Sequence, residues 1–212
     1  MSIEKIVAKN LLDVKAVSLR PNEPFTWASG IKSPIYCDNR WVLSFPEKRS
    51  IVADGFVELI KKEYPDCEVV MGTATAGISW AALVADRMGL PMGYVRSSNK
   101  DHGKGNKIEG KIEAGQKVVI VEDLISTGGS VKDVVLSLRE AGAEVLGVVA
   151  IFSYLLPASF EMFKSLDCDF KTLSNYDVLI DVALESDYIA DSDLEKLKAW
   201  KKDPKDESWM NQ

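Results

Sequence analysis

The sequence feature that most constrains the fold is the run VVIVEDLISTGGSV at residues 118–131. It opens with four consecutive β-branched apolar residues, and a strand without polar alternation is typical of one buried on both faces. Small residues and glycines follow, and a helix is predicted from residue 130 to 141. Because a strand buried on both faces needs helices on both sides of its sheet, the run predicts an α/β fold with a mostly parallel sheet.

The rest of the chain repeats this alternation of strands and helices. Further strands are predicted at residues 68–71, 91–95, 117–121, 145–152 and 170–173, and helices at 2–12, 46–64, 77–88, 157–166, 176–189 and 192–202, followed by a frayed polar tail. Prolines, a glycine and aromatics crowd residues 20–40, which favours short strands and turns. The length of 212 residues suits a single domain with a small lobe attached.

Composition excludes several classes of protein. The net charge is −6 and no long block is basic, so we expect no nucleic-acid partner. The chain has three cysteines without a CxxC pair, which argues against a disulfide framework or a zinc site and favours reduced thiols in the cytoplasm. The N-terminus is polar and no run approaches the ~20 apolar residues of a membrane span, so no membrane partner is expected.

The chemistry is concentrated where the buried strand is predicted to end. Glu122 and Asp123 stand there, and ligands of open α/β sheets bind beyond the carboxyl ends of the strands. The turn at residues 124–129 offers backbone N–H groups and a helix N-terminus, which suit a phosphate. Adjacent carboxylates suit paired hydroxyls such as those of a ribose. The alternative is a helix cap with an exposed acidic turn and no ligand. Neither a P-loop nor a dinucleotide fingerprint is present.

This run resembles the phosphoribosyl pyrophosphate signature of the type I phosphoribosyltransferases. The resemblance implies the fold of that family, with two acids contacting the ribose hydroxyls and the turn holding the 5′-phosphate. The residues that it implies for binding phosphoribosyl pyrophosphate here are Glu122, Asp123, Leu124, Ile125, Ser126, Thr127, Gly128, Gly129 and Ser130. Asp123 is the one expected to be catalytic, and Ser126 the one expected near the base.

Three further segments resemble the orotate phosphoribosyltransferases within that family. FTWASGIKSPIYCDNR at 25–40 is similar to their N-terminal hood, GTATAGISWAALVA at 72–85 to their pyrophosphate loop, and YVRSSNKDHGKGNKIEG at 94–110 to their mobile catalytic loop. The resemblance implies a hood formed by residues about 1–45 of the single domain 1–212. It also implies transfer of a phosphoribosyl group to orotate in pyrimidine (UMP) biosynthesis, by a homodimer with shared active sites.

The third segment is basic and is interrupted by glycines. A solvated run of charge is the alternative interpretation, but the resemblance implies that Arg96, Lys100 and His102 contact the diphosphate in the neighbouring subunit. Lys100 and His102 are expected to be catalytic there. Mg²⁺ is the expected cofactor, held mostly by substrate oxygens and water because it prefers phosphates to protein cages. No residue of the chain is predicted as a dedicated metal ligand.

The chain departs from the family at four cationic positions. Ser97 follows Arg96 where the family often has lysine, and Ala76, Ala28 and Tyr154 stand where other relatives place a lysine, a lysine and an arginine. The base carboxylate is therefore expected to meet backbone N–H groups of the hood and Ser126, with Lys32 or Arg40 as candidate cations; the alternative is that both are solvated surface charges and backbone groups alone suffice. Two other functions share parts of the pattern. A transferase for another base would lack the hood motif, and a non-catalytic sensor of phosphoribosyl pyrophosphate would need no basic loop.

Overall fold

The computed structural model describes residues 1–27, 29–96 and 107–212. Its main sheet has six strands in the order β10-β9-β8-β5-β6-β7. They are β5 (Val69–Thr73), β6 (Met92–Val95), β7 (Ile108–Glu109), β8 (Lys117–Ile125), β9 (Glu144–Ser153) and β10 (Phe170–Asn175). All neighbours pair in parallel except β7, which is antiparallel to β6. The predicted α/β architecture with a mostly parallel sheet is thus confirmed.

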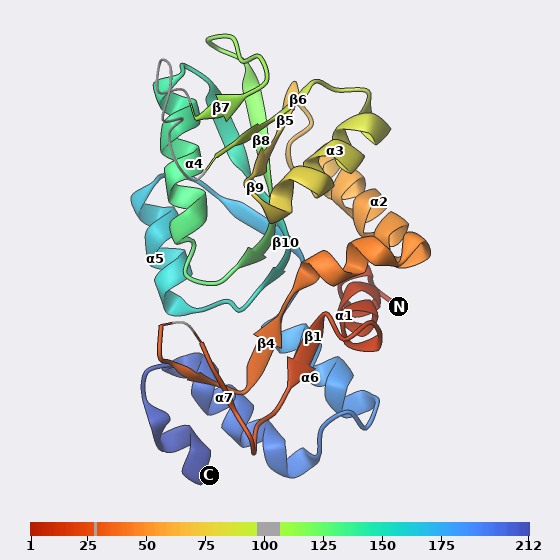
Figure 1. Ribbon diagram of the computed structural model, residues 1–212, viewed down its shortest axis with the longest axis vertical. Coiled ribbons are helices and arrows are strands. Elements are labelled where there is room, and N and C mark those ends of the chain that lie inside the picture. The colour runs from red at the N-terminus through yellow and green to blue at the C-terminus, as the bar shows by residue number, and fades with distance from the viewer. Residues whose placement is uncertain (28, 97–106) are drawn as a thin grey trace.

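Helices cover both faces of this sheet (Figure 1). Val119 and Val121 of β8 belong to the hydrophobic cluster that also holds α1 (Ile3–Asp13), α2 (Pro46–Glu63), α3 (Ala76–Met88) and α6 (Tyr176–Glu185). Val118 and Ile120 alternate with them and pack in a second cluster with α4 (Gly129–Glu140) and α5 (Pro157–Ser165). All four side chains are fully buried. The unbroken apolar run is therefore explained by a strand with no solvent-facing side.

A second, smaller assembly, the hood, lies beyond the ends of the parallel strands (Figure 1). It contains two antiparallel strand pairs, β1 (Val17–Leu19) with β4 (Ile35–Cys37) and β2 (Phe25–Thr26) with β3 (Lys32–Ser33), and the 3-10 helix η1 (Asn39–Ser44). The C-terminal elements η2 (Asp191–Asp193), α7 (Leu194–Lys202) and η3 (Glu207–Asn211) complete it. Helix α1 packs instead on α6, β10 and α2. The hood is thus made from both ends of the chain.

Two local predictions are wrong, and each has a physical reason. Strand β8 continues to Ile125, because β9 goes on pairing with it through Leu124↔Phe152 and Ile125↔Ser153. The two acids therefore lie within the strand, and the turn begins only at Ser126. The tail is not frayed, because Trp209 is only 1% exposed and belongs to the main hydrophobic cluster. One indole buries enough apolar surface to order a short polar segment.

The described residues include all three cysteines. All three cysteine thiols are free. In that part of the chain no group of three or more His, Cys, Asp or Glu side chains is placed to hold a metal ion. Within the same residues, every helix is too short or too polar to cross a lipid bilayer.

Candidate active site

The predicted site residues come together because three parallel strands end at one edge of the sheet. Thr73 of β5 lies in register with Val95 of β6, and Gly72 with Val121 of β8, so the chain segments that follow these positions are neighbours. With ~4.8 Å between adjacent strands, the ends of β6 and β8 are about 10 Å apart. The hood closes over this edge, where the Asn39 side-chain amide donates to the carbonyl oxygen of Asp123 at 2.6 Å.

Glu122 and Asp123 form a carboxyl pair in which Glu122 is buried and Asp123 is half-buried. Glu122 is only 5% exposed, its Oε1 accepts from the backbone N–H of Asp123 at 2.9 Å, and its Oε2 accepts from the Ser130 hydroxyl at 3.4 Å. Burial, and then the adjacent charge of Asp123, raise the pKa of Glu122 to about 8. Burial also raises the pKa of Asp123, an effect that the nearby Arg40 guanidinium opposes. Without a ligand, the pair therefore retains a proton at neutral pH, and hydroxyl donors would favour its ionised form.

The turn after β8 leads directly into the N-terminus of α4. Gly128 caps the helix with a φ of 84°, and an added Cβ there would collide with the end of the Met162 side chain on α5. No side chain among the described residues caps α4, so the N–H groups of its first turn are available to an anion. Thr127 is exposed and Ser126 is half-buried beside them. The expected phosphate turn is thus open to solvent and tightly backed by α5.

A second tight loop, residues 74–76, lies beside this turn and joins β5 to α3. A Cβ at Gly77 would overlap the carbonyl oxygen of Val121, and one at Gly72 would lie 2.9 Å from the Gly77 carbonyl oxygen. Two glycines therefore let the loop lie directly against β8. Helix α3 also begins without a side-chain cap from the described residues. Two helix N-termini thus flank the carboxyl pair, which is an arrangement suited to a ligand with phosphates at both ends.

The structure places the other expected residues unevenly. Arg96 follows β6 at the same edge, and its Nη1 lies 3.6 Å from Oε1 of Glu109. The side chain of Ile125 is fully buried, so only its backbone can face a ligand. Lys100 and His102, together with the departures at Ala28 and Ser97, lie outside the described residues. Tyr154 is buried, and its ring stacks on Trp27 at 5.4 Å.

The two cations considered for the base carboxylate are both engaged in the hood. The Arg40 Nε and Nη2 donate to the two carboxylate oxygens of Asp38 at 2.6 and 2.7 Å. The Lys32 ammonium donates to the Thr26 hydroxyl at 2.8 Å. Arg40 keeps further guanidinium donors beyond this pair, because a guanidinium carries five N–H groups.

Sequence reasoning missed two buried polar residues at the site. Asn39 has no exposed surface, and it accepts from the Cys37 thiol at 3.2 Å while donating to Asp123. Thr73, only 2% exposed, donates from its hydroxyl to the Val121 carbonyl oxygen at 3.5 Å. Thr73 is the last residue of the apolar strand β5, and this position at the carboxyl end of a strand could have identified it from the sequence. Nothing in the local pattern around Asn39 distinguishes it, because its partner is 84 residues away.

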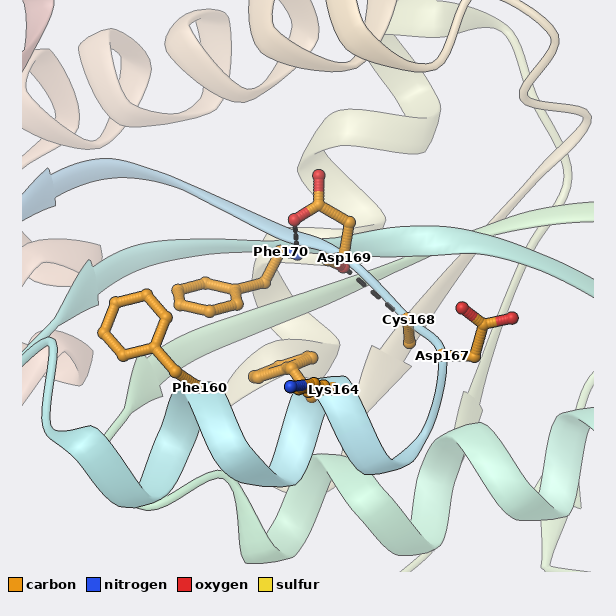
Figure 2. A pocket seen from close by; sticks show the side chains of 7 residues that line it. Phe160, Lys164, Asp167, Cys168, Asp169 and Phe170 are labelled. Carbon is orange, nitrogen blue, oxygen red and sulfur yellow. Dashed lines mark hydrogen bonds between the residues drawn. The ribbon is translucent and has the colours of Figure 1, made fainter.

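A hollow of about 510 Å³ lies elsewhere, between α5 and the start of β10. Figure 2 shows the rings of Phe160 and Phe170 on one side of it and the carboxylates of Asp167 and Asp169 at its rim. Phe170 pairs with Val148 near the beginning of β9, whereas the carboxyl pair lies near the end of β8. This hollow is therefore separate from the candidate site.

Comparisons with known proteins agree with this geometry. Residues 50–176 match the phosphoribosyl transferase domain family. The chain is 60% identical over 206 residues to the orotate phosphoribosyltransferase of Bacillus pumilus, covering 97% of each chain. It is 56% identical to that of Bacillus subtilis, covering 98% of this chain and 96% of the relative. The crystal structure of orotate phosphoribosyltransferase from Aeropyrum pernix superposes with a TM-score of 0.74 at 27% identity, over 87% of this chain and 99% of that one. The expected type I phosphoribosyltransferase fold is confirmed, and the chain belongs to the orotate phosphoribosyltransferase family.

Proposed function

We propose that this enzyme transfers the 5-phosphoribosyl group of phosphoribosyl pyrophosphate to orotate, giving orotidine 5′-phosphate and pyrophosphate in pyrimidine biosynthesis. The observation that carries this proposal is the carboxyl pair of buried Glu122 and half-buried Asp123, which lies between two helix N-termini at one sheet edge. Relatives that share most of the sequence over nearly its whole length bear the name of this activity. Neither a sensor nor a transferase for another base has such support.

The ligand is proposed to lie along the sheet edge. The ribose hydroxyls donate to Glu122 and Asp123, the turn at residues 126–130 holds the 5′-phosphate, and the loop at residues 74–76 faces the diphosphate. Three observations support this order: Glu122 is buried with Asp123 half-buried beside it, and each of the two loops leads into a helix whose first N–H groups have no side-chain cap from the described residues. Arg96, Lys100 and His102 are proposed as the cations that reach the diphosphate, those of one subunit serving the site of the other.

Transfer follows from the charges at this edge. The bond between ribose C1 and the pyrophosphate oxygen breaks, and its electron pair leaves with pyrophosphate. The base nitrogen gives up its proton to the released pyrophosphate or to solvent, and the electron pair of the broken N–H bond forms the new bond to C1. Positive charge that develops on the ribose is stabilised by the ionised pair Glu122–Asp123, acting through the hydroxyls that they accept from. Lys100 and His102, which lie outside the described residues, are proposed to meet the leaving group.

Mg²⁺ is the proposed cofactor. When bound, it neutralises the charge of the diphosphate. The donor set fits this role, since Ala74, Thr75 and Ala76 offer the diphosphate no cationic side chain. The described residues also hold no cluster of three or more metal-ligating side chains, and Mg²⁺ commonly binds through substrate phosphates and water with few protein ligands.

The base is proposed to lie between the turn and the hood. Ser126, the first residue after β8, is the proposed contact of the orotate carboxylate, with hood backbone N–H groups beside it. The hood lies against this turn because the Asn39 side chain donates to the carbonyl oxygen of Asp123. The segment after β9 lies against it as well, because the Tyr154 N–H donates to the Ile125 carbonyl oxygen. A site built around donors for a carboxylate rejects a base that lacks it.

The active form is proposed to be a cytoplasmic homodimer of single-domain subunits. One hydrophobic cluster runs from Val7 to Trp209, which supports a single domain. Tyr36, Trp41 and Phe45 are 49%, 54% and 40% exposed on one stretch of the hood, and such exposed aromatics suit contact with a second copy. The free thiols accord with a reducing compartment.

A panel of bases tests the function. The enzyme is incubated with Mg²⁺, phosphoribosyl pyrophosphate and one base at a time, and pyrophosphate release is measured. Orotate should be used about 10⁴-fold better than uracil in kcat/KM, because uracil would leave buried donors unpaired. Hypoxanthine should not be used. Equal kcat/KM for orotate and uracil would overturn the proposed base, and pyrophosphate release with hypoxanthine alone would favour a purine transferase.

A further inference from the structure

Trp200 of the C-terminal helix α7 joins the hood to the site. It is fully buried, and its indole N–H donates to the carbonyl oxygen of Lys32 on β3 at 3.1 Å. Its ring meets the ring of Trp27 edge-on at 5.6 Å and that of Tyr154 edge-on at 5.9 Å. One side chain from the end of the chain thus contacts the hood hairpin β2–β3 and the segment that follows β9.

The two partner rings are themselves fixed. Tyr154 is bound to the end of β8, because its N–H donates to the Ile125 carbonyl oxygen at 3.1 Å, directly before Ser126. Trp27 stands in the turn of the hairpin, where its N–H donates to the Ile31 carbonyl oxygen at 2.9 Å and its indole to that of Ile35 at 3.3 Å. We call these three side chains in mutual contact, Trp27, Tyr154 and Trp200, the aromatic brace. It spans the gap between the hairpin and the turn after β8.

Helix α7 provides a fixed base for the brace. The Tyr176 hydroxyl, at the start of α6, donates to the Leu197 carbonyl oxygen at 3.1 Å, and its ring lies 5.4 Å from that of Trp200. Asn22, ahead of the hairpin, bonds Asp193 at 3.0 Å and Lys196 at 2.8 Å. The side of α7 that carries Trp200 is therefore held by α6 and the hood together.

We infer that Trp200 is a positioning residue for the base, setting the distance between the hairpin β2–β3 and the turn at residues 126–129. This inference rests on the proposed function, which places orotate between those two segments. Trp200 itself touches no substrate. The phosphate-binding loops are anchored differently, by Gly72, Gly77 and Gly128 against neighbouring backbone and α5. A loosened brace should therefore weaken orotate binding and leave phosphoribosyl pyrophosphate binding nearly unchanged.

Trp200→Phe is the sharpest test, because it keeps an aromatic ring and removes the bond to Lys32. The expected result is a KM for orotate raised about tenfold, with kcat and the KM for phosphoribosyl pyrophosphate within about twofold of the parent. Trp209→Phe is the matched control. Trp209 is equally buried in the same terminal segment, but its indole N–H has no partner among the described residues. It should lower the Tm similarly and change neither KM.

Tyr176→Phe provides a second variant, since it releases the Leu197 carbonyl without touching the brace or the hairpin. It should raise the KM for orotate in the same selective way, by about threefold. It also decides the matter if Trp200→Phe is insoluble. An unchanged KM for orotate in the soluble variants, or an equal rise in both KM values, would overturn the inference. So would a rise in Trp209→Phe as large as that in Trp200→Phe.

Hydrogen exchange separates this inference from the proposed function. The hairpin turn is closed by two backbone hydrogen bonds, from the Trp27 N–H to the Ile31 carbonyl oxygen and from the Gly30 N–H to the Trp27 carbonyl oxygen. The exchange rates of these two amides therefore measure how often the turn opens, without any substrate. They should exchange about tenfold faster in Trp200→Phe and unchanged in Trp209→Phe. If the parent enzyme does not use orotate, the proposed function fails, yet faster exchange would still support the brace. Unchanged exchange in Trp200→Phe would overturn the brace even in an active enzyme.

Discussion

The turn after β8 and the hood lie against each other, yet they are assembled in opposite ways. The acids, the turn and the first helical residues of the site occupy one run of nine positions, 122–130. The hood combines strands from the first 45 residues with α7 and η3 from the last 20. The hydrogen bonds of the Glu122 carboxylate reach Asp123 and Ser130, at most 8 residues away, whereas the Trp200 bond to Lys32 spans 168 residues. The residues proposed for the chemistry are therefore encoded in a short run, and the proposed recognition of the base depends on the whole fold.

Asp123→Asn tests whether the chemistry resides in the local region alone. It should reduce kcat about a hundredfold, since one lost transition-state contact of ~3 kcal/mol has that effect on a rate. The hood should be undisturbed, because Asn39 bonds the backbone of Asp123 rather than its side chain. Steady-state kinetics and a thermal melt measure the two effects. Near-normal turnover in a folded variant would remove this turn from the site.

Hybrid dimers extend the comparison to the basic loop, which is proposed to serve the other subunit. Lys100→Ala and Asp123→Asn should each be inactive, and both lesions should fall in the same site of a mixed dimer. Random mixing should then restore about a quarter of the parental activity, because half of the dimers are mixed and each has one intact site. Verified hybrids without activity would show that the loop works within its own subunit.

Glu122→Gln, in the turn region, should stabilise the unliganded enzyme, whereas the hood variant Trp200→Phe should destabilise it. The pKa of Glu122 is raised from 4.5 to about 8, so the native state retains a proton that the unfolded chain releases. The free energy of unfolding of the parent therefore falls as pH rises through that window. The amide has no charge to bury and keeps an oxygen for the Asp123 N–H. At pH 8 it should stabilise the unliganded enzyme by about 2 kcal/mol, with less gain at pH 5, while activity falls.

Urea denaturation at both pH values measures this difference. Trp200→Phe is the comparison variant from the hood, and it should destabilise the enzyme at either pH because it loses buried packing and a hydrogen bond. If Glu122→Gln is less stable than the parent at pH 8, the buried charge of Glu122 does not destabilise the folded enzyme.

The same contrast explains what the sequence alone could predict. The strand, its acids, the turn and both flanking helices were predictable, because burial on both faces and turn chemistry are marked by neighbouring residues. The extension of β8 to Ile125 was not, since it depends on pairing with β9. Leu194, Leu197 and Trp200 recur every three residues in a charged helix, which marks a buried face but not its partner, and Trp209 lies in a polar tail without periodicity. Only the packed fold shows that they complete the hood.

The smallest expected effects concern the two hood cations near the base. Arg40 follows Asn39, whose side chain bonds Asp123, and its charge opposes the rise in the pKa of Asp123. Lys32 points instead to Thr26 on its own hairpin. Arg40→Met should therefore raise the KM for orotate about threefold, and Lys32→Met should hardly change it. The effects are small because ion pairs between exposed charges contribute little binding energy in water.

Asp38 binds the Nε and Nη2 of Arg40 through both carboxylate oxygens. This bidentate pair fixes the orientation of the guanidinium and therefore of its remaining N–H donors. The Arg40 side chain is 63% exposed, so salt should screen its attraction for a carboxylate. The effect of Arg40→Met on the KM for orotate should therefore be smaller at 0.5 M salt than at 0.05 M salt. Between these concentrations the Debye length falls from roughly 14 to 4 Å. Steady-state KM values for orotate at both salt concentrations measure the effect of the substitution. A larger effect from Lys32→Met would place the carboxylate on the hairpin side. No effect from either would leave Ser126 and the backbone N–H groups as its contacts, and the hood would then select the base by shape and backbone alone.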